Sequence, residues 1–291
     1  MKFSRLAAHI AFAIALLFSA VFAAAEDPSW TRPFPVFRIA GHLYYVGSEE
    51  LASYLISTPD GLILINSNLK ESVPQIRQNI ERLGFKFSDI KILLISQGHF
   101  DHCAGSAEIV RETGAKYYVM QPDVDVVESG GHTDFHYGQD KSSWFEPTKV
   151  DHALVDGEQV KLGGTVLTAH LTAGHNKGTT TWTMDEVEHG RVLHVVIVGG
   201  PNVNSGYKLV DNAEYPQIAD DFARGFDVLD QLPCDIFLGA HGSYFGLTDK
   251  FDRYHKGGRN TFIDPAGYQT YITDRRHAFE KELKRQQRAK P

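Results

Sequence analysis

Three side chains of metal-binding type fall close together in the stretch Gln97-Gly98-His99-Phe100-Asp101-His102. Imidazole nitrogens and carboxylate oxygens together are ligands that suit zinc. The stretch follows the continuous apolar run 90–95, which predicts a strand buried on both faces and then a loop. An irregular backbone can turn His99, Asp101 and His102 toward one point, and their crowding favours a pair of ions. Taken alone, the stretch could also be an ordinary polar loop.

Two further histidines occupy similar places in the chain. His175 closes the stretch 172–175, where a predicted strand gives way to a glycine-rich turn, and His241 follows the apolar run 236–240. Glycine beside each histidine lets the backbone approach an ion closely. Any one of them could be a hydrogen-bonded loop histidine. Histidines beside glycine follow predicted strands at three places in the chain, and it is improbable that all three are ordinary loop histidines. We therefore predict a metal centre assembled from distant loops.

The elements that must position these loops form two groups, each with strands followed by helices. The first group has an antiparallel meander of strands at 36–39, 43–46, 53–57 and 62–65, a helix at 72–83, the strand at 90–95, a helix at 105–112, a strand at 116–120 and a short helix at 124–128. The second has strands at 153–155, 159–162, 165–170, 179–184 and 192–198, a helix at 218–229, a strand at 236–240 and a helix at 264–284. This order predicts two sheets packed face to face with helices outside. No low-complexity linker separates the groups, so we expect one domain.

The N-terminal residues 1–25 have the features of a signal peptide. Lys2 and Arg5 precede an apolar stretch at 10–21, and small residues at 23–25 precede Glu26. An uncleaved membrane anchor is the alternative, because the apolar run is nearly long enough to span a bilayer. His9 and the many alanines lower its hydrophobicity. We therefore expect cleavage, a periplasmic location, no membrane association afterwards, and a single domain at 26–291.

Charge and cysteine content narrow the class of partner. The formal net charge of −7 argues against nucleic-acid binding, so small soluble molecules are the expected partners. The chain has only two cysteines, Cys103 and Cys234. They could form a disulfide in an oxidising compartment, but we favour two free thiols. We expect a monomer.

The metal-binding pattern resembles that of the metallo-β-lactamase superfamily, whose motif is H-x-H-x-D-H followed by two distant histidines. The corresponding residues here are Gln97, His99, Asp101 and His102, then His175 and His241. The chain resembles the third subclass of the class B β-lactamases in the stretches 35–39, 44–47, 51–56, 83–91, 134–138, 175–178 and 206–209. This resemblance covers nearly the whole chain after residue 25. It implies an α/β fold of four layers, an αββα sandwich in which two mixed β-sheets lie face to face between helices.

The resemblance also implies two zinc ions. Gln97, His99 and His175 would hold the first ion, and Asp101, His102 and His241 would hold the second. Gln97 departs from the family pattern, which has histidine at this position. An amide oxygen is a weaker zinc donor than imidazole, so we expect weaker binding at the first site. The family partner of Cys234 would lie near the C-terminus, where this chain has Tyr268, so that disulfide is not expected.

The activity implied is that of a β-lactamase, which hydrolyses the amide bond of the β-lactam ring of penicillins, cephalosporins and carbapenems and confers antibiotic resistance. Zinc lowers the pKa of a bound water toward about 7, and the resulting hydroxide is expected to attack the lactam carbonyl. Asp101 is then a catalytic residue that orients the nucleophile, with His99 and His175 on the first ion. Asn202, Asn204 or Ser205 would contact the substrate carboxylate.

Two other functions remain open. A hydrolase of the same fold that acts on thioesters or lactones would carry a bridging carboxylate in the turn 199–205, which here contains neither Asp nor Glu. That difference favours the β-lactamase. The second alternative is a catalytically weak periplasmic zinc-binding protein, in which Gln97 has weakened the site. Hydrolysis that a chelator abolishes would distinguish an enzyme from a zinc-binding protein without turnover.

Overall fold

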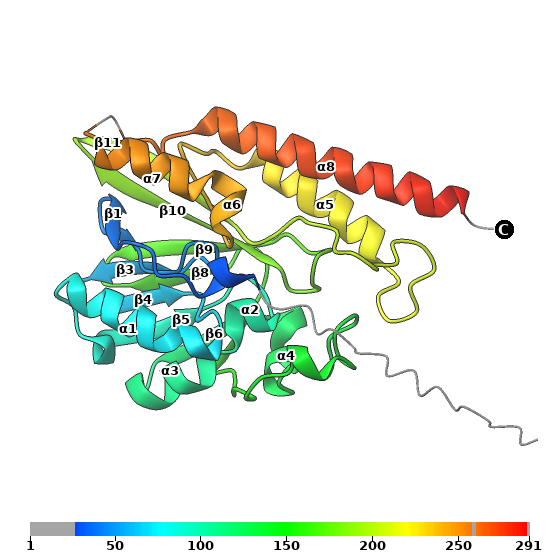
Figure 1. Cartoon of the computed structure of the whole chain (residues 1–291), viewed down its shortest axis with the longest axis horizontal. Helices are drawn as coiled ribbons and strands as arrows, with labels where there is room; N and C mark the ends of the chain where they lie inside the picture. Colours follow the sequence, from blue (N-terminus) through cyan, green and yellow to red (C-terminus); the bar gives the residue numbers. More distant parts are fainter. Residues whose placement is uncertain (1–26, 258–259, 290–291) are drawn as a thin grey trace, which may run out of the picture.

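The computed structural model describes residues 27–257 and 260–289, which form two β-sheets face to face with helices on both outer surfaces (Figure 1). This arrangement confirms the αββα sandwich expected from the sequence. The predicted signal peptide, residues 1–25, lies outside the described residues. Within the described part of the chain, no helix has both the length and the apolar character needed to cross a membrane.

Among the described residues, the first sheet has seven strands in the order β1 to β7. The expected antiparallel meander is formed by β1 (Phe37–Ala40), β2 (Leu43–Tyr45), β3 (Tyr54–Thr58) and β4 (Gly61–Ile65). The parallel strands are β5 (Ile90–Leu94), β6 (Lys116–Met120) and β7 (His152–Leu154). Lys91 in β5 is exposed, so the prediction of burial on both faces is wrong at this position. Its side chain lies near the turn between β3 and β4, where Gly61 leaves room for it.

The second sheet, in the part of the chain that the structure describes, has five strands in the order β12-β11-β10-β9-β8. Its antiparallel strands are β8 (Gln159–Leu162), β9 (Thr165–Leu171), β10 (Thr180–Glu188) and β11 (Arg191–Val198). The last strand, β12 (Ile236–Gly239), runs parallel to β11. The predicted metal-binding loops follow β5 in one sheet and β12 in the other. Loops at the carboxyl ends of such strands are where α/β sheets place their functional sites.

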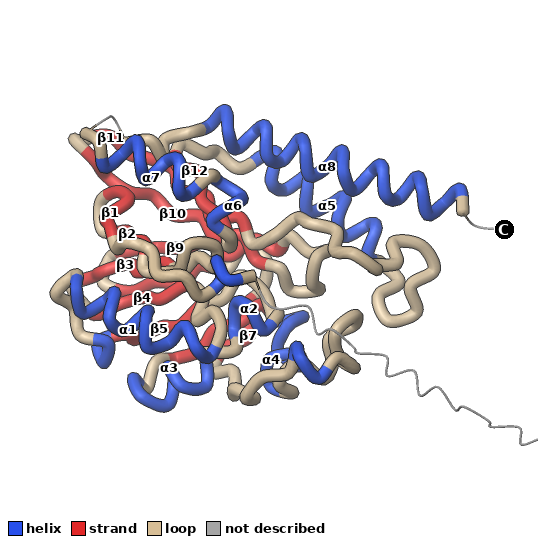
Figure 2. Tube along the Cα trace, in the orientation of Figure 1, coloured by secondary structure: helices blue, strands red, loops and turns tan. Residues whose placement is uncertain are grey.

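Helices cover the outer surfaces of both sheets (Figure 2). On the side of the first sheet lie α1 (Val73–Arg82), α3 (Ser106–Thr113) and α4 (Val124–Glu128). On the side of the second lie α5 (Ile218–Gln231), α7 (Leu247–His255) and α8 (Pro265–Arg288). Single helical turns form α2 (Phe100–Cys103) and α6 (Gly242–Phe245). Short 3₁₀ helices occur at Pro28–Trp30, Lys70–Ser72, Phe87–Asp89, Gln121–Asp123 and Lys141–Ser143.

The sequence did not predict α2, α6 or α7. We expected irregular backbone at Asp101 and His102, and this expectation is wrong because both residues lie in α2. A single helical turn contains too few residues for apolar periodicity to show. The other α-helices and all strands of the described chain were predicted, with ends that differ by no more than the four residues seen at the carboxyl ends of β10 and α8, whereas the 3₁₀ helices were not predicted.

An apolar core fills the space between the two sheets, and Trp182, Tyr45 and Tyr54 are among its largest fully buried side chains. A second cluster packs α1 and α3 against the other face of the first sheet. The Tyr54 hydroxyl donates a hydrogen bond of 2.7 Å to the Gly239 carbonyl and so links β3 to β12 across the core. This bond fixes the end of β12 two residues before His241.

The two cysteines are both free, as the sequence analysis favoured. Cys103 is buried in α2, and Cys234 is partly buried before β12. Tyr268 is fully buried and donates a hydrogen bond of 2.6 Å to the Leu229 carbonyl. Its aromatic ring therefore fills a core position. The family resemblance implied that related enzymes have the disulfide partner of Cys234 at this position.

Candidate metal centre

A cavity of about 310 Å³ opens where the loops after β5, β9 and β12 meet. Among the predicted ligands, His99, Asp101, His175 and His241 line this cavity. Gln97 and His102 are almost completely buried and do not line it. The predicted substrate contacts Asn202 and Asn204 also line the cavity, whereas Ser205 is exposed and borders a separate groove beside α8. The structure thus gathers the predicted site residues at one place, apart from Ser205.

Hydrogen bonds from both sheets fix the loop after β5. The side-chain oxygen of Asn66, at the end of β4, accepts a bond of 2.7 Å from the Ser96 amide. The Ser96 carbonyl accepts a bond of 2.7 Å from the Thr180 amide of β10. The Trp182 indole donates to the Ile95 carbonyl at 3.1 Å. The backbone that leads into the metal-binding residues is therefore held before the first ligand is reached.

His99 is the N-cap residue of α2, and its carbonyl accepts a hydrogen bond of 3.0 Å from the His102 amide. His99 itself has extended backbone, while Asp101 and His102 lie in the helical turn. The change from extended to helical backbone turns the side chains in different directions. One short segment thus offers side chains to both predicted ligand sets.

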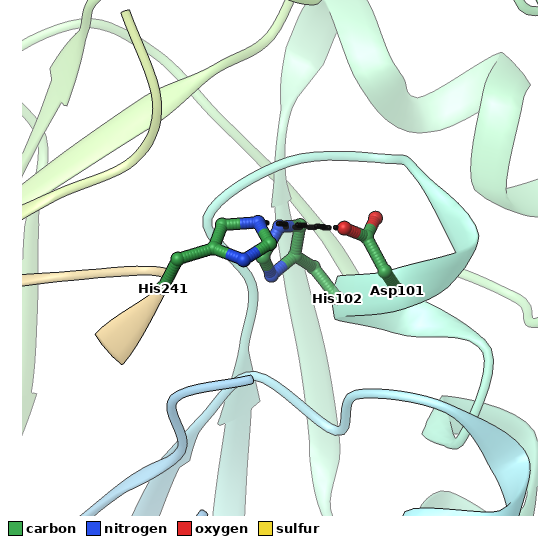
Figure 3. Close-up of side chains that lie close together, drawn as sticks. All are labelled: Asp101, His102 and His241. Atoms are coloured by element: carbon green, nitrogen blue, oxygen red, sulfur yellow. Dashed lines mark ion pairs between the residues drawn. The ribbon is translucent and has the colours of Figure 1, made fainter. Parts of the chain in front are cut away.

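The second predicted set, Asp101, His102 and His241, has ligand atoms that all lie within 4.8 Å of one another. His102 Nε2 is 3.3 Å and His241 Nε2 is 3.5 Å from Asp101 Oδ2 (Figure 3). The His102 side chain is completely buried, and neither of its ring nitrogens has a hydrogen-bond partner. Leaving a buried polar group unpaired costs about 1–3 kcal/mol, and a metal ion at this point would remove that cost. The residues therefore fit a metal ion.

The first predicted set brings His99, His175 and Gln97 to the other side of the same site. The His99 and His175 rings are 5.0 Å apart. His175 Nδ1 lies 2.7 Å from the Asn202 carbonyl, which can only accept, so Nδ1 carries the hydrogen and Nε2 is left with its lone pair. Gln97 Oε1 is buried and has no hydrogen-bond partner. This unpaired oxygen fits a metal ligand, although it belongs to a weaker donor than imidazole.

Gly200 allows the turn after β11 to lie close to the first set. A Cβ atom on this residue would lie 3.6 Å from Gln97 Nε2 and 3.9 Å from His175 Cδ2. Its φ angle of +147° lies in a region that side-chain-bearing residues rarely adopt. Glycine is therefore needed here to bring Asn202 against His175.

Of three acidic residues that the sequence analysis did not single out, two contact predicted ligands and the third holds the backbone of the loop after β5. Asp134 Oδ2 lies 3.3 Å from His99 Nε2, and Glu50 Oε1 lies 3.4 Å from His241 Nδ1. Asp123 is fully buried and accepts hydrogen bonds from the amides of Gly98, at 2.8 Å, and Gly178, at 2.7 Å. Only Asp134 left a trace in the sequence, inside a stretch that resembles the family. Acidic residues in turns are usually solvated, so the other two gave no signal.

Burial and charge set the ionisation of the site. Burial lowers the pKa of His102 and of His175 to about 3, which keeps both rings in the neutral form that binds metals. Burial acts to raise the pKa of Asp101, but His102 and His241 outweigh it and hold that pKa well below its usual range. For His241, contacts with Asp101 and Glu50 outweigh burial and raise the pKa to about 9. Asp101 is therefore a permanent anion, which suits a dication.

Aromatic side chains form much of the cavity wall, including Trp30, Phe100, Tyr137, Phe145 and Tyr244. Trp144 precedes Phe145 in the loop between α4 and β7. It does not line the cavity and packs instead on His132, with the indole donating to the Gly138 carbonyl at 3.1 Å. Trp144 thus fastens the loop, and Phe145 faces the site. None of the described residues that line the cavity is lysine or arginine.

Comparison with known proteins agrees with this geometry. Residues 51–195 match the family described as the metallo-beta-lactamase superfamily. The structure is similar to the native FEZ-1 metallo-β-lactamase of Legionella gormanii, with 56% sequence identity and a TM-score of 0.88, over 88% of this chain and 98% of that chain. The chain therefore belongs to the metallo-β-lactamase superfamily.

Two further solved structures narrow the relationship. BJP-1, a subclass B3 metallo-β-lactamase of Bradyrhizobium japonicum, is 35% identical with a TM-score of 0.84, over 90% of this chain and 98% of that one. GOB-18 of Elizabethkingia meningoseptica, also a metallo-β-lactamase, is 37% identical with a TM-score of 0.84, over 89% of this chain and 96% of that one. Within the superfamily the protein is an enzyme similar to those of subclass B3.

Proposed function

We propose that this enzyme is a zinc-dependent β-lactamase that hydrolyses the amide bond of the β-lactam ring. The observation that carries the proposal is that members of both predicted ligand sets line one cavity, while buried nitrogen or oxygen atoms in both sets have no hydrogen-bond partner. The similarity to metallo-β-lactamases over nearly the whole chain supports this activity. The absence of Asp and Glu from the turn 199–205 favours it over thioester or lactone hydrolysis.

Asp101, His102 and His241 would hold one zinc ion, and Gln97, His99 and His175 would hold the other. Zinc bound there would supply Lewis acidity and a water of lowered pKa, which gives a nucleophile at neutral pH. Asp101, which His102 and His241 keep ionised, would accept a hydrogen bond from the nucleophile and so orient it toward the lactam carbonyl. The Asn202 carbonyl keeps the hydrogen of His175 on Nδ1 and so fixes which nitrogen faces the site.

Uncharged groups would bind the substrate. Asn202 Nδ2 donates to the Tyr244 hydroxyl at 2.7 Å, and Asn204 Nδ2 donates to the Tyr137 hydroxyl at 3.0 Å. Because each tyrosine oxygen accepts in these pairs, its own O–H hydrogen stays available for a ligand. The substrate carboxylate would meet these hydroxyls, since the described cavity wall contains neither lysine nor arginine. Ser205, which was also predicted to contact the substrate, does not line the cavity and would not contact a substrate bound inside it.

The biological setting follows from the same proposal. Residues 1–25 would direct secretion to the periplasm, and the mature domain would act there as a monomer that confers antibiotic resistance. Penicillins, cephalosporins and carbapenems are the proposed substrates.

The test is hydrolysis of a chromogenic cephalosporin by the purified mature protein, with and without EDTA, together with a count of bound zinc. We expect turnover that EDTA abolishes and zinc restores. Asp101→Asn is the matched variant, since it keeps the size of the side chain and removes its charge. Bound zinc without turnover of any β-lactam would refute the proposal and direct the assay to thioesters and lactones.

A further inference from the structure

His241 lies between two carboxylates, one on each side of its ring. Nε2 is 3.5 Å from Asp101 Oδ2, in the direction of the second ligand set, and Nδ1 is 3.4 Å from Glu50 Oε1. Glu50 is not part of the ligand cluster, which among the described residues consists of Asp101, His102 and His241. The carboxylate of Glu50 thus faces Nδ1 of His241, the ring nitrogen that is not the one near Asp101.

Glu50 is itself held in place. Its Oε2 accepts a hydrogen bond of 3.0 Å from the Ser243 amide, and its Oε1 accepts one of 2.5 Å from the Ser243 hydroxyl. Its backbone carbonyl accepts a bond of 2.7 Å from the Gly242 amide. A Cβ atom on Gly242 would lie 2.4 Å from the Glu49 carbonyl, so this close approach requires glycine. These bonds fix the Glu50 carboxylate relative to the His241 backbone.

The contact joins the two sheets at the site. Glu50 lies in the loop between β2 and β3 of the first sheet, and His241 follows β12 of the second. The Ala52 amide also donates to the Ala240 carbonyl at 3.0 Å, and Leu51 forms an isolated β-bridge with His241. The orientation of this histidine is therefore set by residues on the opposite sheet.

An ionised carboxylate only accepts hydrogen bonds. Facing Nδ1, it favours the tautomer that carries the hydrogen there and leaves the Nε2 lone pair free to bind an ion. A carboxylate partner also makes the ring a stronger donor to a metal. His102, the other histidine of the set, has no hydrogen-bond partner on either nitrogen, so its ring receives no such help.

We propose that Glu50 is a positioning residue, which fixes the tautomer and ring orientation of His241 and thereby strengthens zinc binding at the second site. The inference rests on the proposed zinc-dependent function. It assigns to Glu50 no contact with substrate and no proton transfer.

The experiment compares zinc affinity in wild type, Glu50→Gln, Glu50→Ala and Glu49→Gln, by competition with a chromophoric zinc chelator. Glu49 is the matched control, because it adjoins Glu50 in sequence but pairs with Arg32 at the surface. Loss of a carboxylate that supports a ligating histidine lowers metal affinity by roughly 10–100-fold. We expect Glu50→Ala to lose affinity in this range at one of the two sites. Glu50→Gln should lose less, since its amide oxygen still accepts weakly, and Glu49→Gln should match wild type.

A second readout separates positioning from a loss of folding. In the zinc-loaded protein, the Nδ1–H of His241 should give a ring N–H signal in the NMR spectrum that is protected from exchange in wild type and Glu49→Gln. This signal should be lost in Glu50→Ala. If Glu50→Ala does not fold, Glu50→Gln carries both measurements.

The outcomes distinguish this inference from the proposed function. Wild-type zinc affinity and an unchanged His241 signal in the Glu50 variants would overturn the inference, even if β-lactams are hydrolysed. Zinc binding without β-lactam hydrolysis would refute the proposed function, while the Glu50 comparison still decides the inference. A wild-type protein that binds no zinc would refute both.

Discussion

Tyr54→Phe tests whether the hydrogen bond between the sheets stabilises the fold near the metal centre. The Tyr54 side chain is completely buried, and its hydroxyl lies 2.7 Å from the Gly239 carbonyl. Phenylalanine keeps the ring and its packing but removes the donor, so a buried carbonyl loses a partner. That loss costs about 1–3 kcal/mol. For a domain of this size, each kcal/mol lowers the melting temperature by about 2–4 °C, so we expect a decrease of about 2–12 °C.

Thermal unfolding followed by circular dichroism in the presence of EDTA measures this effect without a contribution from bound metal. Tyr44→Phe is the matched control, because Tyr44 lies in the neighbouring strand β2 and is only partly buried. We expect the free energy of unfolding of the control variant to lie within about 0.5 kcal/mol of the wild-type value, as is usual for surface substitutions. Equal melting temperatures for Tyr54→Phe and Tyr44→Phe would show that the bond between the sheets contributes no stability.

Three further predictions concern the metal centre and the pH dependence of stability. Asp101→Asn should bind less zinc and abolish hydrolysis of a chromogenic cephalosporin; bound zinc and turnover at the wild-type level would contradict the role of this carboxylate. Gln97→His should raise zinc affinity at the first site, measured by chelator competition, because imidazole is a better zinc donor than an amide oxygen; an unchanged affinity would mean that Gln97 is not a ligand. Burial raises the pKa of Glu186, which is 4% exposed and accepts a hydrogen bond from the His42 amide. The folded state therefore binds the proton more tightly than the unfolded state, and stability should fall as pH rises from the unfolded value through the raised pKa. The free energy of unfolding, measured by urea unfolding at several pH values, should lose this part of its pH dependence in Glu186→Gln. If the free energies of the wild type and the variant change with pH in parallel, the prediction is wrong.

The fold could be predicted from the sequence because its strands carry strong apolar signals. The prediction failed where that signal ends. The strand β10 continues to Glu188 beyond the predicted end at Met184, through exposed Asp185 and buried Glu186. Strands are predicted from apolar and β-branched residues, so a buried acidic residue such as Glu186 gives no strand signal. The short helices α2 and α6 were missed because four residues do not reveal a helical period.

The candidate ligands could be predicted because histidine and aspartate near glycine at strand ends are uncommon and chemically specific. The residues that orient them could not. Glu50 and His241 belong to different sheets, and Asp134 meets His99 only through the fold. A lone acidic residue in a turn is most often solvated, so nothing in its local sequence distinguishes an orienting carboxylate from a surface one.

If the proposed zinc sites are correct, the contacts of the predicted ligands favour one order of zinc binding. The second set contains the anionic ligand Asp101, whose carboxylate offsets part of the charge of a dication, and His241 is oriented by Glu50. The first set has no anionic ligand and includes Gln97, whose amide oxygen is a weak donor. Its histidines are supported by Asp134 and by the Asn202 carbonyl, but this support does not supply a charge within the ligand set. The second site should therefore fill first when zinc is added to the metal-free enzyme, and the first site should fill only at higher zinc concentration.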